Sequence, residues 1–128
     1  MTAPIRVLLL EDNAVFREAL ELLFGLRSDV EVVGSIGDGA GALEACRELG
    51  PDVLLLDYRL PGMDGLRVAE ALKEGCPGVA LVCLTASASP RELAGLREAG
   101  VAATLTKDQE LDEIIAALHR AAGRTPPA

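Results

Sequence analysis

Apolar residues along the chain fall into five short runs, separated by amphipathic stretches. Each run has five or six residues and is bounded by turn-forming residues, as expected of strands buried on both faces of a parallel sheet. The runs cover residues 5–10, 30–35, 53–57, 79–84 and 102–106. We therefore predict a strand over each of them.

The stretches between the runs repeat apolar residues at helical spacing, which predicts a helix in each. The five predicted helices cover residues 14–26, 39–49, 66–74, 90–99 and 111–122. In the first helix the expected core-facing stripe consists of Val15, Ala19, Leu22 and Leu26, widened by Phe16, Leu20 and Leu23. The lone histidine, His119, lies in the last helix next to Arg120, and we expect it at the surface or at the boundary of the core.

Strict alternation of strands and helices with short connections predicts an α/β domain with helices on both faces of a parallel sheet. The expected architecture is a doubly wound, flavodoxin-like sheet of five strands. We assign residues 1–122 to this domain. Residues 123–128 contain a glycine and two prolines, and we expect a tail or the start of a linker there.

Composition narrows the possible functions. The 128 residues carry 20 acidic and 12 basic side chains, a net charge of −8, so we expect no direct nucleic-acid binding by this domain. No apolar run approaches the length of a membrane span, and the N-terminus lacks the layout of a signal peptide. Cys46, Cys76 and Cys83 lack metal-ligand spacing, and we expect free thiols in a reducing, cytoplasmic compartment.

Chemically capable residues follow four of the five predicted strands. They are Glu11-Asp12, Asp57, Thr85 and Lys107. The carboxyl ends of parallel strands meet at one edge of the sheet, where such folds bind ligands. Two like charges 4 Å apart repel by about 4 kcal/mol at an effective dielectric constant of about 20, so clustered carboxylates require a cation. Carboxylate oxygens suit Mg²⁺, and a nearby amine and hydroxyl suit phosphoryl transfer, with Asp57 as the nucleophile.

Four segments, in order, resemble the receiver (CheY-like) domain of bacterial response regulators. They are residues 9–13, 55–65, 84–86 and 105–107, and the resemblance spans residues 5 to about 122. It implies the strand order 2-1-3-4-5 and a phosphoacceptor module rather than an enzyme, at most promoting its own phosphorylation and dephosphorylation. The donor it implies is a phosphohistidine on a sensor histidine kinase. We interpret Met63-Asp64-Gly65 as a turn that sets the direction of the loop, not as a site in itself.

The resemblance also assigns roles to the residues at the strand ends. Asp57 accepts the phosphoryl group, Thr85 bonds one of its oxygens and Lys107 pairs with its charge. Mg²⁺ is bound by Asp12, Asp57 and the backbone carbonyl of Arg59, whereas Glu11 acts through water. In receivers the region around the first helix docks the kinase, so Ala14 and Arg17 are candidate partner contacts.

Two positions depart from the usual receiver pattern. Thr104 occupies the place of an aromatic switch residue, which puts coupling through an aromatic flip in doubt. Asp108 replaces a common proline and, with the segment 57–65, is similar to receivers joined to LuxR-type helix-turn-helix domains. That likeness implies transcription regulation through a C-terminal DNA-binding domain. The oligomeric state is not determined by the sequence, and a homodimer is compatible with it.

Three other functions fit the sequence less well than that of a phosphoacceptor. A phosphohydrolase with an aspartyl nucleophile usually has a second Asp two residues later, where this chain has Arg59. A flavin-binding domain would need a phosphate-binding loop after the first strand, where Glu11 and Asp12 would repel phosphate. A pseudo-receiver that only binds partners is disfavoured by the complete set of acids, threonine and lysine, although Thr104 keeps it open.

Overall fold

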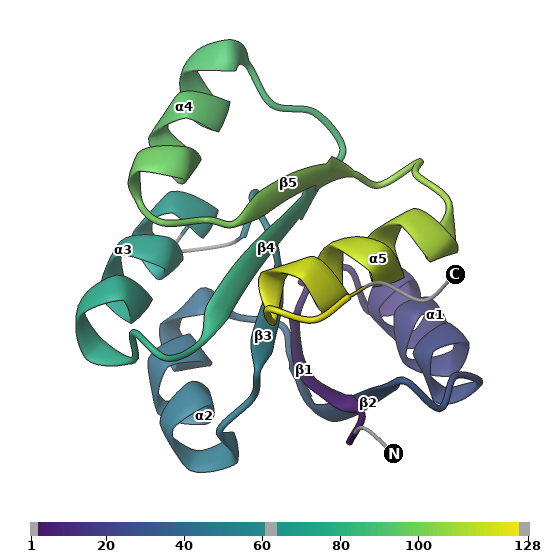
Figure 1. Ribbon diagram of the computed structural model, residues 1–128. Helices are drawn as coiled ribbons and strands as arrows, with labels where there is room; N and C mark the ends of the chain where they lie inside the picture. The colour runs from purple at the N-terminus through teal and green to yellow at the C-terminus, as the bar shows by residue number, and fades with distance from the viewer. Residues whose placement is uncertain (1–2, 61–63, 126–128) are drawn as a thin grey trace.

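A sheet of five parallel strands in the order β2-β1-β3-β4-β5 forms the centre of the molecule, as expected (Figure 1). The computed structural model describes residues 3–60 and 64–125, so Pro61-Gly62-Met63 and the end of the expected tail lie outside the described residues. The strands are β1 Ile5–Leu10, β2 Val30–Ile36, β3 Val53–Asp57, β4 Ala80–Thr85 and β5 Ala103–Thr106. Each predicted strand is present, with its ends within one residue of the prediction.

Helices cover both faces of the sheet. They are α1 Ala14–Gly25, α2 Ala42–Leu49, α3 Gly65–Gly75, α4 Pro90–Glu98 and α5 Leu111–Ala121, with a short 3₁₀ turn, η1 Gly39–Gly41, before α2. Helices α1 and α5 pack on one face, and α2, α3 and α4 pack on the other (Figure 1). None of the helices within residues 3–60 and 64–125 is long and apolar enough to cross a membrane.

Alternate residues of the central strands supply the two halves of the core. In β1, Leu8 and Leu10 join the cluster under α2 to α4, whereas Val7 and Leu9 join the cluster under α1 and α5. Because successive side chains of a strand point to opposite faces, a strand covered on both sides must be apolar at nearly every position. This explains why β1, β3 and β4 were recognisable as continuous apolar runs, and it fixes the strand ends where the polar residues begin.

Helix α1 faces the core with a different side from the one predicted. Leu20 and Phe24 are buried and Phe16 is partly buried, whereas Val15, Leu22 and Leu26 are 78%, 69% and 78% exposed. The centre of the expected stripe therefore lies on the solvent side, whereas Phe16 and Leu20, expected at its margin, face the core. Helix α1 is apolar on more than one side, so the spacing of its apolar residues does not determine which side faces the core. In the structure the large rings of Phe16 and Phe24 fill the space against the sheet.

His119 is buried, with 8% of its surface exposed, contrary to the prediction of a surface or boundary position. Its Nε2 lies 2.8 Å from Oδ2 of Asp29, which precedes β2. Arg27 donates two hydrogen bonds to the same carboxylate, of 2.9 and 3.1 Å, and its proximity holds the pKa of Asp29 well below the ordinary value. The partner lies 90 residues away in sequence, so the pattern of the last helix could not reveal it.

Candidate phosphoacceptor site

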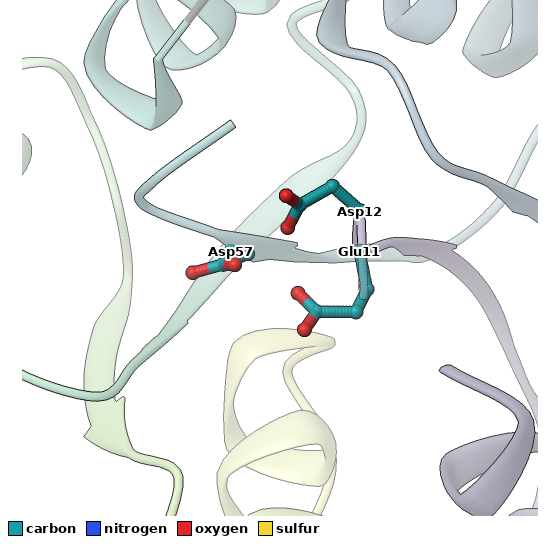
Figure 2. Close-up of side chains that lie close together, drawn as sticks. All are labelled: Glu11, Asp12 and Asp57. Atoms are coloured by element: carbon teal, nitrogen blue, oxygen red, sulfur yellow. The ribbon is translucent and has the colours of Figure 1, made fainter. Parts of the chain in front are cut away.

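Strands β1 and β3 bring three acids together at the carboxyl edge of the sheet. Leu10 of β1 pairs with Leu56 of β3, so Glu11 and Asp57 follow side by side. Ligand atoms of Glu11, Asp12 and Asp57 all lie within 4.8 Å of one another, and Figure 2 shows their carboxylates gathered at the ends of the two strands. Glu11 and Asp57 are buried and Asp12 is exposed. This donor set fits a hard cation such as Mg²⁺, which takes one or two carboxylates and keeps several waters.

Lys107 supplies the positive charge of the site. Its Nζ donates to Oε1 of Glu11 at 2.6 Å and to Oδ2 of Asp57 at 3.2 Å. Two contacts hold the lysine in place: its backbone N–H donates to the Thr85 carbonyl at 2.9 Å, and its ammonium lies 4.7 Å from the centre of the Phe16 ring. The lysine, which directly follows β5, therefore bridges the ends of β1 and β3.

Burial and mutual charge shift the protonation equilibria of this cluster. Burial raises the pKa of Glu11 to about 7; the hydrogen bond from Lys107 opposes this rise, and Asp57 adds to it. Desolvation would lower the pKa of Lys107, but its bond to Glu11 and the charge of Asp57 outweigh that effect and raise it. The acids are thus costly to ionise together, and additional positive charge at this edge would stabilise their ionised form.

Thr85 and Arg59 lie beside the cluster in different ways. Thr85 ends β4 and is buried, but its hydroxyl donates to the carbonyl of Ser87 at 3.0 Å rather than to the acids. The backbone N–H of Arg59 donates to Oδ1 of Asp57 at 3.3 Å, which places Arg59 next to the carboxylate that the sequence marked as the nucleophile.

Two residues of α1 support the site without having been assigned to it. Phe16 lies under the Lys107 ammonium, and Arg17 donates from Nη1 to the backbone carbonyl of Glu11 at 2.6 Å. Sequence reasoning placed Phe16 in the core and Arg17 among the possible partner contacts. Asn13 caps α1 just after the end of β1, and Phe16 and Arg17 follow it by three and four residues. This spacing was the signal in the sequence that could have placed them at the site.

The start of α3 packs directly on the residues that follow Asp57. Asp64 caps the helix by accepting from the Arg67 N–H at 3.0 Å. Gly65 donates its N–H to the Tyr58 carbonyl at 2.7 Å, and a Cβ at this glycine would lie 2.8 Å from the Tyr58 Cα. Asp64 and Gly65 therefore hold the start of α3 against Tyr58, next to the site, in agreement with the turn role expected of them.

Comparisons with known proteins agree with this geometry. Residues 7–119 match the family model of the response regulator receiver domain. The probable transcriptional regulatory protein NarL of Mycobacterium tuberculosis strain H37Rv is 39% identical over 121 residues, 94% of this chain and 56% of that protein. The chain thus spans about half the length of the curated relatives it matches.

Solved structures show the same likeness. The signal receiver domain of the putative response regulator NarL from Mycobacterium tuberculosis superposes with a TM-score of 0.90 at 36% identity, covering 95% of this chain and 98% of that one. A LuxR-family two-component response regulator from Aurantimonas sp. SI85-9A1 gives a TM-score of 0.88 at 25% identity, over 96% and 89% of the two chains.

A doubly wound sheet that collects three acids and a lysine at its carboxyl edge defines a receiver domain, and this chain belongs to the response regulator receiver family. Within that family its likeness is to two-component response regulators of the NarL type, in the LuxR group.

Proposed function

We propose that the domain accepts a phosphoryl group on Asp57 from a phosphohistidine of a sensor histidine kinase, and that this switches an output in the cytoplasm. The observation that carries the proposal is that Asp57 lies beside the acids that follow β1 and accepts a hydrogen bond from the Lys107 ammonium at 3.2 Å. An aspartate so placed has an ammonium beside its carboxylate and neighbouring acids that would hold a metal ion, and both charges would favour phosphoryl transfer.

In the proposed reaction a carboxylate oxygen of Asp57 attacks the phosphorus atom. The P–N bond breaks, its electron pair stays on the imidazole nitrogen, and the product is an acyl phosphate on Asp57. Lys107 neutralises charge on the transferring group from the side of β5. The Thr85 hydroxyl would have to leave the Ser87 carbonyl to donate to a phosphoryl oxygen, which is a rotation of one side chain.

Magnesium would be held by Asp12, Asp57 and the backbone carbonyl of Arg59, with Glu11 acting through water. When bound, it would offset the negative charge of the acids and of the phosphoryl oxygens. The support for this assignment is the donor set itself, three carboxylates whose ligand atoms lie within 4.8 Å. The pKa of Glu11, raised to about 7, fits a site whose acids need added positive charge.

The exposed apolar side of α1 supports a helical protein partner. Val15, Ala19, Leu22 and Leu26 follow the four-three-four spacing of a coiled-coil seam. Contiguous exposed apolar side chains mark interaction sites, and this spacing suits another helix. We assign this side to docking of the kinase. By analogy with the regulators it resembles, the output is transcription regulation through a C-terminal DNA-binding domain.

Intact-protein mass spectrometry after incubation with acetyl phosphate and Mg²⁺ tests the proposal. We expect one added phosphoryl group on the wild-type chain and none on Asp57→Asn or after chelation of the metal. Asp64→Asn is the matched control, because asparagine caps a helix as well as aspartate does and this acid lies outside the cluster. Equal labelling of Asp57→Asn would refute the assignment, and no labelling of any variant would favour an interaction module that works unmodified.

A further inference from the structure

Helix α4 is tied to the loop after Asp57 by one side chain, that of Glu92. Glu92 is the third residue of the helix and forms a capping box with Ser89: its carboxylate accepts from the Ser89 N–H at 2.9 Å, and its own N–H donates to the Ser89 hydroxyl at 3.1 Å. The other carboxylate oxygen lies 3.4 Å from Nη2 of Arg59. Glu92 therefore links the first turn of α4 to the second residue after Asp57.

Arg59 is joined to the site and to Tyr58 as well. Its backbone N–H donates to Asp57 at 3.3 Å, and its guanidinium lies 5.3 Å from the centre of the Tyr58 ring. The Tyr58 ring is buried against Glu92; burial and the neighbouring carboxylate raise the pKa of the tyrosine hydroxyl. The Tyr58 backbone is itself fixed by Gly65, so the movable part of this connection is the Arg59 side chain, which is 62% exposed.

Charge decides what phosphorylation does to this connection. An exposed ion pair such as that of Arg59 with Glu92 is weak, so a second anion can compete for the guanidinium. A phosphoryl group adds a charge of about −1.5 to −2 and three strong acceptor oxygens. Here it would be added to the carboxylate that accepts from the Arg59 backbone N–H, two residues along the chain from that carboxylate. The position of Thr104 on β5 carries no aromatic ring that could respond instead.

We propose that Glu92 is a positioning residue, which holds Arg59 in the unmodified domain and releases it to the phosphoryl group on Asp57, loosening the first turn of α4. The proposal rests on the proposed function. Two anions then compete for the Arg59 guanidinium: the Glu92 carboxylate on α4 and the phosphoryl group on Asp57. The segment that loses its contact on phosphorylation is the amino end of α4.

Amide hydrogen exchange of the first turn of α4 tests this, with and without beryllofluoride and Mg²⁺ as the phosphoryl mimic. In the wild-type chain we expect the mimic to raise the exchange rates of the Glu92 and Leu93 amides about two- to fivefold, the range for loss of one exposed ion pair. In Arg59→Ala and Glu92→Gln the unmodified domain should already exchange at the raised rate and should respond no further. Glutamine still completes a capping box, so Glu92→Gln removes the charge and keeps the cap.

Two comparisons separate this coupling from general damage to the helix. Glu98→Gln alters an exposed acid at the other end of α4 and should respond like the wild type. Phosphoryl uptake by Glu92→Gln, measured by mass, should be retained, because Glu92 lies outside the group of acids at the site. A wild-type response in Glu92→Gln, or no response of α4 in a wild-type chain that takes up phosphoryl, would overturn the relay and leave the proposed function standing. Loss of uptake in the wild type would refute the function itself.

Discussion

The contact between Gly65 and Tyr58 can be tested by adding a single methyl group. In Gly65→Ala the new Cβ would lie 2.8 Å from the Tyr58 Cα and 3.2 Å from the carbonyl oxygens of Asp57 and Tyr58. Carbon atoms in contact sit about 3.5–4.0 Å apart, so α3 or the loop must move by about 0.7 Å or more. Both sides are backbone, and the 2.7 Å hydrogen bond from Gly65 to Tyr58 ties them together, so the movement reaches Asp57.

The expected cost combines two opposing terms. Overpacking of this kind destabilises by about 1–3 kcal/mol, whereas replacing glycine by alanine in a helix returns up to about 1 kcal/mol. A net loss of about 1–2 kcal/mol would lower the melting temperature by about 4–8 °C for a domain of this size. Because Asp57 is displaced, phosphoryl uptake should also slow, by about tenfold.

Urea denaturation and a time course of phosphorylation by acetyl phosphate measure both effects. Gly25→Ala is the control: it also replaces a glycine within a helix, and its Cβ would meet no atom within 4 Å. That variant should be as stable as the wild type or more so, with unchanged uptake. If Gly65→Ala matched Gly25→Ala in both assays, the loop would not be held by this contact.

Three further predictions follow from other contacts. Asp29→Asn should lower the free energy of unfolding at pH 7 by about 1–2 kcal/mol, because its ion pair with Arg27 is lost and its hydrogen bond with His119 is weakened. The pKa of Asp29 is lowered on folding, so this stabilisation should be present above the ordinary pKa of the carboxyl and should shrink progressively as the pH falls below about 4; a difference that stays the same from pH 5 down to pH 2 would contradict the assignment. Lys107→Met should be less stable than the wild type at pH 8, because Glu11 and Asp57 lose their ammonium partner. MgCl₂ should therefore raise the melting temperature of this variant more than that of the wild type. An equal rise in both would show that the lysine and the metal bind different acids. Thr104→Tyr should change the coupling of phosphorylation to output more than its rate, and unchanged coupling would show that a ring at this position is irrelevant.

The sequence was sufficient for the sheet and for the edge at which the site forms. Strands buried on both faces need nearly continuous apolar residues, so both the strands and their polar ends were visible without any structure. The residues Glu11, Asp12, Asp57 and Lys107 were predicted to meet because parallel strands share one carboxyl edge, and the structure places their side chains together.

What the sequence could not supply was orientation. Helix α1 has apolar residues on two sides, and only packing against the sheet shows that Phe24 faces inward and Leu22 outward. The contacts of His119 with Asp29, and of Arg59 with Glu92, join residues far apart in the chain, so no local spacing reveals them. The Thr85 hydroxyl was expected at the site, but its present acceptor is set by the local turn at Ser87.

The strand order bears on how the domain folds during synthesis. Strand β1 is the first of the five to leave the ribosome, yet it lies between β2 and β3 and cannot complete its pairing until residue 56 has emerged. Lys107 comes fifty residues after Asp57, and until then Glu11 and Asp57 have no ammonium between them. The strands therefore become available from the β2 edge of the sheet towards β5, and the cluster of acids and lysine is complete only when nearly the whole domain has been made.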